Sequence, residues 1–229
     1  MSSPTPAPRT CIVALGGGAG NALNHLLPAG LPGVTTLAAN TDAQDLKRSR
    51  AETTVLLGRE VTRGLGANSD PEVGAQATNA TADELRDGLL GARLVIVLGS
   101  LGGGTGSGAA PVIVELARAA GAVVVPIVTL PFAFEGRRRR RQADEALVAL
   151  AAASDGIVAV AHGGVWLDLG KRLMTEAFHE MDEAVECAVH ALLARVAAVH
   201  GTAELEAVTK EWAGTWTPQT PIGTAPEQK

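Results

Sequence analysis

A run of glycines between two apolar segments is the part of this sequence with the clearest capacity for chemistry. Residues 102–108 read Gly-Gly-Gly-Thr-Gly-Ser-Gly, between the apolar run 94–98 and a helix-like run that opens at Ala110-Pro111. Glycine permits positive φ and has no Cβ, so successive N–H groups can converge on a phosphate, aided by the N-terminus of the next helix. Pro111 suits a first helical turn. The alternative, a flexible linker, is disfavoured because apolar residues flank the run.

A second glycine run follows the first apolar segment of the chain. Residues 11–15 predict a short strand, which leads into Gly-Gly-Gly-Ala-Gly-Asn at 16–21 and then a helical pattern. Polar residues likewise follow a strand predicted at 34–39. In open α/β sheets, ligands bind outside the carboxyl ends of the strands. The turns after residues 15, 39 and 98 should therefore converge at one edge of the sheet.

The elements that must position these turns alternate between strands and helices. Further strands are predicted at 55–57, 94–98, 123–128 and 157–160, with a loop at 64–74 and a helix at 81–90. Nearly continuous β-branched runs are typical of strands buried on both faces of a parallel sheet. The predicted fold is therefore α/β, with a doubly wound, mostly parallel sheet. An apolar stripe at helical spacing predicts a long central helix over about 165–199.

Composition and charge disfavour several classes of protein. The 229 residues are 46% hydrophobic, enough for one well-cored domain, and the net charge of −5 argues against nucleic-acid binding. Cys11 and Cys187 have no metal or redox spacing, which indicates a reduced, cytoplasmic protein. The N-terminus lacks the features of a signal peptide, and the glycines within the uncharged stretch 94–114 are incompatible with a membrane span. No membrane insertion is expected.

The sequence does not match two common nucleotide-binding motifs, and the mismatches fall at positions that those motifs need for their chemistry. The P-loop requires lysine after its last glycine, but Thr105 stands there. The dinucleotide fingerprint requires glycine where Asn21 stands, and a substrate domain is lacking, so a nicotinamide-dependent enzyme is disfavoured. His179, Glu183, Glu186 and His190 share a helix face but match no metal motif, so no metal site is predicted among them.

The heptad at 102–108 instead resembles the signature G-G-G-T-G-[ST]-G of the tubulin superfamily and, within it, of the bacterial cell-division GTPase FtsZ. The resemblance covers roughly residues 10–200 and includes, in order, the stretches 16–21, 40–44, 64–67, 71–74, 109–111, 128–136 and 177–178. It implies the FtsZ nucleotide-binding domain fold, binding of GTP or GDP, and Mg²⁺ bound together with GTP.

The resemblance also implies roles for individual residues in the phosphate and ribose sites. The first phosphate loop would consist of Gly17, Gly18, Ala19, Gly20 and Asn21. The β and γ phosphates would be held by Gly104, Thr105 and Gly106. Glu135 would accept from the ribose hydroxyls, and Arg139 would lie near the phosphates. Ala19 stands where the family usually has another glycine.

For the base, the resemblance implies that Phe178 stacks on guanine and that Asp182 accepts from its N1–H and N2–H₂ groups. Independently of the family, residues at i and i+4 share one helix face, so a ring and a carboxylate can meet one base. The alternative is a core phenylalanine and a solvated aspartate. His162 falls where the family has an asparagine that contacts the base, which weakens purine selectivity there.

Five arginines at 137–141 wrap around a helix, so most must face solvent. One or two can reach a ligand, and an acidic partner surface could use the others.

In this family, an acidic loop after the central helix enters the nucleotide site of a neighbouring molecule and positions the attacking water. The FtsZ loop reads N-x-D-x-x-D; here Glu204 and Glu206 align with the asparagine and first aspartate, and Thr209 with the second aspartate. Glu204 and Glu206 are therefore the predicted catalytic residues, acting in a neighbouring subunit. A threonine hydroxyl cannot supply the anionic role.

The chain is expected to divide into a flexible tail at 1–9, an FtsZ-like GTP-binding domain at 10–200, a remnant of the acidic loop at 201–213 and a disordered tail at 214–229. FtsZ continues into a further subdomain that forms half of the filament contact, and this chain is expected to lack it. We expect weak or partner-dependent GTP hydrolysis by a homo-oligomer or together with a full-length FtsZ. The alternative is a non-catalytic nucleotide-binding regulator that caps or copolymerises with a full-length FtsZ.

Overall fold

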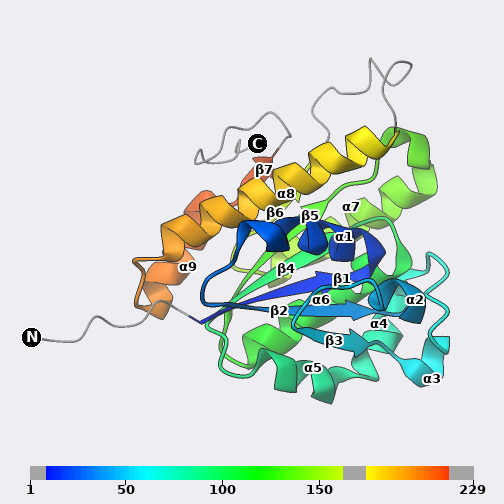
Figure 1. Ribbon diagram of the computed structural model, residues 1–229, viewed down its shortest axis with the longest axis horizontal. Helices are drawn as coiled ribbons and strands as arrows, with labels where there is room; N and C mark the ends of the chain where they lie inside the picture. Colours follow the sequence, from blue (N-terminus) through cyan, green and yellow to red (C-terminus); the bar gives the residue numbers. More distant parts are fainter. Residues whose placement is uncertain (1–8, 162–173, 217–229) are drawn as a thin grey trace, which may run out of the picture.

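A single parallel sheet organises the molecule. The computed structural model describes residues 9–161 and 174–216 (Figure 1). Its seven strands lie in the order β3-β2-β1-β4-β5-β6-β7, and every pairing is parallel. The strands are β1 Thr10–Leu15, β2 Val34–Asn40, β3 Thr53–Leu56, β4 Leu94–Ser100, β5 Val123–Thr129, β6 Val158–Val160 and β7 Gly214–Trp216. The prediction of an α/β, doubly wound sheet is confirmed.

Helices connect the strands and cover both faces of the sheet. They are α1 Gly16–Leu26, α2 Ala43–Leu46, α3 Arg59–Thr62, α4 Pro71–Asn79, α5 Ala82–Leu89, α6 Gly104–Ala119, α7 Arg137–Ala153, α8 Met174–Val196 and α9 Thr202–Trp212, with 3-10 turns η1 Leu27–Ala29 and η2 Ala133–Glu135. The long central helix is confirmed as α8; the predicted residues 165–173 lie outside the described part of the chain. No helix within 9–161 or 174–216 is long and apolar enough to cross a membrane.

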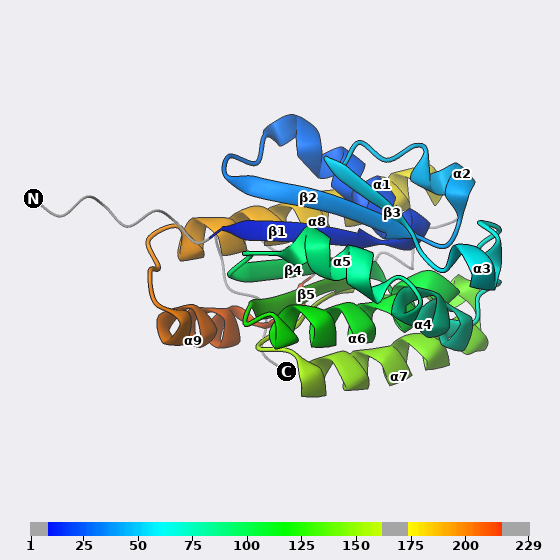
Figure 2. The same cartoon turned by 90° about the horizontal axis from the view of Figure 1, so that it is seen from below.

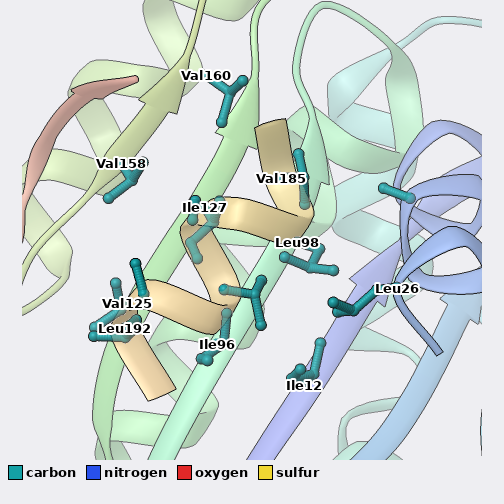
Figure 3. Close-up of a cluster of buried hydrophobic side chains, with 14 of the residues drawn as sticks. Ile12, Leu26, Ile96, Leu98, Val125, Ile127, Val158, Val160, Val185 and Leu192 are labelled. Atoms are coloured by element: carbon teal, nitrogen blue, oxygen red, sulfur yellow. The ribbon is translucent and has the colours of Figure 1, made fainter. Parts of the chain in front are cut away.

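Alternating side chains of each strand divide the core into two layers. Ile12, Ile96 and Val125 face α1 and α8, where Leu26, Val185 and Leu192 complete one layer (Figure 3). The neighbouring residues of the same strands, such as Val13 and Val97, pack on the opposite face. Helices α5, α6 and α7 cover that face (Figure 2). The burial of β1, β4 and β5 on both faces is what continuous apolar runs predict, whereas the edge strand β3 keeps Thr53 and Thr54 exposed.

The glycine heptad is less of a loop than the sequence suggested. Helix α6 begins at Gly104, not at Ala110, so Pro111 lies inside the helix and cannot donate to the carbonyl of Ser107. Within the heptad, only Gly102 has a positive φ, at 93°. The later glycines allow close packing instead: a Cβ at Gly108 would overlap the carbonyl oxygen of Pro71 in α4. The close crossing of α4 and α6 was not predicted from the sequence, because glycines at the start of a helix resemble a turn.

The C-terminal part of the described chain is also more regular than expected. Residues 201–213, interpreted as a remnant of a loop, form α9, because Leu205, Thr209 and Trp212 recur at helical spacing and are buried. Residues 214–216, placed in the predicted disordered tail, pair with β6 as β7. The predicted loop 64–74 ends early, since Asp70 caps α4 by accepting from the backbone N–H of Glu72 at 2.9 Å.

Candidate functional site

A cavity of about 510 Å³ opens at the carboxyl ends of the central strands. It lies where the strand order reverses between β1 and β4, the point at which doubly wound sheets bind ligands. Its lining includes residues after β1 (Gly16, Gly17, Gly18), after β2 (Thr41, Asp42) and after β4 (Leu101, Gly103, Gly104). The three turns therefore converge as their positions after the strands predicted. The volume is in the range of small-molecule sites.

Two helix N-termini open into this cavity without a side-chain cap. The N-cap residues are Leu15 for α1 and Gly103 for α6; neither gives a side-chain hydrogen bond, and neither helix has an acidic residue in its first turn. By contrast, α2 and α4 are capped by Asp42 and Asp70. Uncapped first-turn N–H groups carry partial positive charge and suit an anion. The cavity is thus built to receive an anion at the two glycine runs.

Most of the residues predicted to hold a nucleotide line this one cavity. Those that do are Gly17, Gly18, Asn21, Gly104, Thr105, Gly106, Glu135, Arg139, Phe178 and Asp182. Ala19 and Gly20 are not part of its lining. Both lie within α1, and Ala19 is 2% exposed because it turns into the core layer with Leu23. A first phosphate loop made of 16–18 with Asn21 therefore fits the geometry better than the five consecutive residues.

Three hydroxyl residues that sequence reasoning did not assign to the nucleotide, Thr41, Ser100 and Thr129, also line the cavity. The hydroxyls of Thr41 and Thr105 lie 2.7 Å apart and share a hydrogen bond, and Thr129 donates to the hydroxyl of Ser100 at 3.0 Å. All four belong to the cavity wall. Ser100 and Thr129 are the last residues of β4 and β5, so a polar residue that ends an otherwise apolar strand was the available signal.

Glu135 and Arg139 form an internal pair at the cavity rim. The Arg139 guanidinium donates to Glu135 Oε2 at 2.5 Å, and Glu135 Oε1 accepts from the backbone N–H of Phe132 at 2.8 Å. Each carboxylate oxygen keeps a second lone pair that can accept from a ligand hydroxyl. The pair fixes Glu135 in place and holds Arg139 against the wall.

Phe178 and Asp182 lie together at another part of the wall, on successive turns of α8. All three phenylalanines of the chain gather there: Phe132 stacks on Phe134 and meets Phe178 edge to face, with ring centroids 5.0 and 5.2 Å apart. Phe178 remains 46% exposed, so its ring is accessible to a ligand. Burial raises the pKa of Asp182 to about 6, an effect that the nearby His25 and His179 partly oppose.

The cavity wall carries more negative than positive charge. Asp42, Asp45, Glu135 and Asp182 line it, whereas Arg139 is the single lysine or arginine among the described lining residues. An anion bound here depends on the helix N-termini, and a polyphosphate would need a divalent cation to offset the carboxylates.

Histidines and carboxylates on α1 and α8 are close without forming a metal site. His25 pairs with Glu186 at 3.0 Å, and His179 with Glu183 at 3.3 Å. Within the described ranges, no group of three or more His, Cys, Asp or Glu residues is arranged to hold a metal ion. His162, the expected replacement for a base-contacting asparagine, lies outside the described residues.

The predicted catalytic residues Glu204 and Glu206 are not part of the cavity of their own molecule. They lie on α9, which follows the end of α8 that is remote from Phe178. The segment between α8 and α9 lies near the start of β4, because Arg93, just before β4, donates to the carbonyl of His200 at 2.8 Å. Figure 1 shows α9 at the opposite end of the sheet from the start of α8. Glu204 is exposed, but Thr209 is fully buried and donates to the carbonyl of Glu206 at 3.0 Å.

Comparison with known proteins agrees with this geometry. The profile of the Tubulin/FtsZ family, GTPase domain, matches residues 9–162, two thirds of the chain. The chain belongs to this family. Its fold is therefore that of the tubulin/FtsZ GTPase domain, and the resemblance inferred from the heptad is confirmed.

Individual members of the family are also similar to this chain in sequence. Cell division protein FtsZ 1 of Pyrococcus horikoshii is 43% identical over 182 residues, which are 79% of this chain and 49% of the relative. FtsZ of Helicobacter pylori strain J99 is 42% identical over 180 residues, 78% of this chain and 47% of the relative. The chain thus spans about half the length of the curated relatives that it matches.

Solved structures of the family are similar in fold to this chain. An empty FtsZ dimer from M. jannaschii is 32% identical, with a TM-score of 0.81 over 89% of this chain and 61% of that one. CetZ2 from Haloferax volcanii, solved as a GTPγS-bound protofilament, is 29% identical, with a TM-score of 0.74 over 86% and 61% of the two chains.

Proposed function

We propose that this chain binds one GTP or GDP in the cavity between β1 and β4, with Mg²⁺ accompanying GTP. The observation that carries the proposal is the pair of uncapped helix N-termini of α1 and α6, which face the same cavity as Phe178 and Asp182. The phosphates lie at the two glycine runs, and the base lies between the Phe178 ring and the Asp182 carboxylate. The excess of carboxylates along the wall supports the need for Mg²⁺.

Guanine selectivity comes from Asp182. An ionised carboxylate can accept from both N1–H and N2–H₂ of guanine, whereas adenine offers neither donor at those positions. Since the pKa of Asp182 is about 6, the group is mainly ionised at pH 7.5 and able to play this part. An unpaired buried carboxylate opposite adenine is unfavourable, so the site rejects ATP.

Hydrolysis is weak or depends on a partner. Glu204 and Glu206 cannot reach their own cavity from α9, so they serve the cavity of a second copy or of a full-length FtsZ stacked head to tail. Thr209 is buried and bonded within α9, which leaves it no part in a neighbouring site. One or two glutamates remain to orient the attacking water.

A second candidate function follows from the same observation. In this second function, α9 stays helical in contact with a neighbouring molecule, and Glu204 and Glu206 do not orient water. The chain then binds nucleotide without hydrolysing it and caps or copolymerises with a full-length FtsZ. Sedimentation of the chain with GTP, alone and with a full-length FtsZ, separates the two. Filaments formed by this chain alone support the first function; incorporation only with FtsZ, without added turnover, supports the second.

The test of nucleotide binding uses the purified chain and its bound nucleotide. After denaturation, chromatography of the released small molecules should show GDP or GTP near one per chain, or the nucleotide-free chain should bind a fluorescent GTP analogue with Mg²⁺. Asp182→Ala should lower the affinity for GTP far more than the affinity for ATP. Glu183→Ala, on the exposed face of the same helix, should leave both affinities unchanged. No guanine nucleotide in either assay would overturn the proposal.

A further inference from the structure

Helix α7 contacts a loop on the far wall of the cavity through a side chain that the nucleotide site does not use. Gln142 Nε2 donates to the carbonyl oxygen of Ser69 at 3.1 Å. Arg138, one turn earlier and one of the five consecutive arginines, directs its guanidinium to the same oxygen at 3.4 Å, a longer and weaker contact. Ser69 and Gly66 line the cavity, so the 66–70 loop is part of its wall.

The 66–70 loop has a backbone that its own residues do not favour. Asn68 and Ser69 have φ values of 49° and 55°, and among the described residues only Arg63 is another non-glycine with positive φ. Asparagine tolerates this region, but serine does so less readily. A conformation of this kind persists where surrounding groups hold it.

The inner side of the loop is pressed against the first residue of α6. A Cβ added at Gly104 would lie 2.8 Å from both the Cβ of Ala67 and the backbone nitrogen of Asp70. Gly104 is also the N-terminal residue of the uncapped helix proposed to receive phosphate. The loop therefore lies between α6, which it contacts closely, and α7, which bonds to its carbonyl.

The amide of Gln142 is only half satisfied. Its nitrogen bonds to Ser69, but its Oε1 is buried and has no hydrogen-bond partner within the described ranges. A buried acceptor without a partner opposes folding, so stability alone is a poor reason for glutamine here. An apolar side chain of the same length would fill the space without that cost but could not hold the loop.

We propose that Gln142, assisted by Arg138, is a positioning residue that holds the 66–70 loop against the N-terminus of α6 and thereby slows release of the bound nucleotide. The inference rests on the proposed nucleotide site. It gives part of the arginine run a role within the molecule, whereas Arg140 pairs with Asp144 at 2.9 Å along α7.

The test compares Gln142→Met with the parent chain and with Arg140→Ala as the matched control on α7. Methionine keeps the length of the side chain and removes the donor. Release of a fluorescent GDP analogue, followed after mixing with excess GDP, should be about five- to ten-fold faster in Gln142→Met, as expected from loss of one hydrogen bond. Gln142→Lys, which keeps an N–H donor, should restore most of the slow release.

Amide hydrogen exchange of the nucleotide-free chain gives a second readout. Peptides that cover residues 64–72 should exchange faster in Gln142→Met, while the thermal midpoint stays unchanged or rises because the unpaired Oε1 is gone. Unchanged exchange and unchanged release in Gln142→Met, or an equal increase in Arg140→Ala, would overturn the proposal. Failure of the parent chain to bind the GDP analogue would contradict the nucleotide site instead, and the exchange measurement would still decide the role of Gln142.

Discussion

The two ends of the sheet differ in how much of a GTPase site each one contains. At the carboxyl end, residues from β1, β2, β4, α7 and α8 converge on one cavity with two uncapped helix N-termini. At the amino end, α9 carries Glu204 and Glu206 on a regular helix with its buried face toward the core. Helix α8 joins the two ends and is about 34 Å long, from its 23 residues at 1.5 Å each.

This difference separates binding from hydrolysis. A single chain contains everything that the proposed guanine site requires, because the fold itself brings those residues together. The acidic residues Glu204 and Glu206 do not line that cavity, so the proposed hydrolysis requires the amino end of one molecule to meet the carboxyl end of another. Affinity should then be independent of protein concentration, while turnover rises with it.

The largest effect is expected where the carboxyl end depends on close backbone packing. Gly108→Ala places a Cβ onto the carbonyl oxygen of Pro71, so α4 and α6 must separate. We expect a loss of about 3 kcal/mol or more in the free energy of unfolding, measured by chemical denaturation. Gly20→Ala is the matched control, because a Cβ there meets nothing within 4 Å. It should be neutral or stabilising by up to about 1 kcal/mol and should leave nucleotide affinity unchanged.

Base recognition should respond next most strongly. Asp182→Ala removes both acceptors for guanine, and GTP affinity should fall roughly 100-fold, the loss of about two charge-assisted hydrogen bonds. ATP affinity should change little. Titration calorimetry with each nucleotide measures this directly; equal losses for GTP and ATP would remove Asp182 from base recognition.

The amino end should affect turnover alone. Glu204→Gln combined with Glu206→Gln should lower GTP turnover about 10- to 100-fold without changing GTP affinity, since neither side chain lines the cavity. Mixing this variant with Asp182→Ala should restore part of the turnover, because one variant supplies an intact cavity and the other supplies intact glutamates. A mixture as inactive as its components would contradict action between molecules.

Acidification should weaken GTP binding through Asp182. Its pKa is raised to about 6, so the acceptor becomes protonated as the pH falls below 6, and GTP affinity should drop by about ten-fold per pH unit there. Dissociation constants for GTP measured from pH 8 to pH 5 should show a change of slope near pH 6. This change of slope should be absent in Asp182→Asn, whose side chain does not titrate.

The stability of the nucleotide-free chain should change in the opposite direction. Burial raises the pKa of Asp182 in the folded chain above its ordinary value of 3.8, so its contribution to stability is present at low pH and is lost as the pH rises through about 6. Asp182→Asn should therefore stabilise the nucleotide-free chain at pH 8, by about 1 kcal/mol, because solvent screens a carboxylate that is only partly buried. A thermal melt of both forms at pH 5 and pH 8 checks the sign, and a destabilised variant at pH 8 would show that burial of the carboxylate is not unfavourable.

Much of the carboxyl end was predictable because its signals are local. Buried strands read as continuous β-branched runs, and the turns after them carried glycines and polar residues at the positions that now line the cavity. Family resemblance assigned the roles of Phe178, Asp182, Glu135 and Arg139. Helical spacing by itself showed only that Phe178 and Asp182 share one face of a helix.

The parts that sequence analysis missed depend on contacts between distant elements. The glycines of the heptad serve a helix crossing that only the approach of α4 reveals, and Ala19 turns into the core because α1 begins at Gly16. Helix α9 was hidden because its apolar residues are few, although Leu205, Thr209 and Trp212 share one face. The link between Gln142 and Ser69 joins residues 73 positions apart, which no local pattern contains.

The central claim is that one chain holds a complete guanine-nucleotide site. Titration calorimetry of the nucleotide-free monomer with GTP and with ATP, each with Mg²⁺ at pH 7.5, tests it most directly. The structure predicts one GTP bound per chain and at least roughly 100-fold weaker binding of ATP. No binding of GTP, or equal affinity for the two nucleotides, would contradict it.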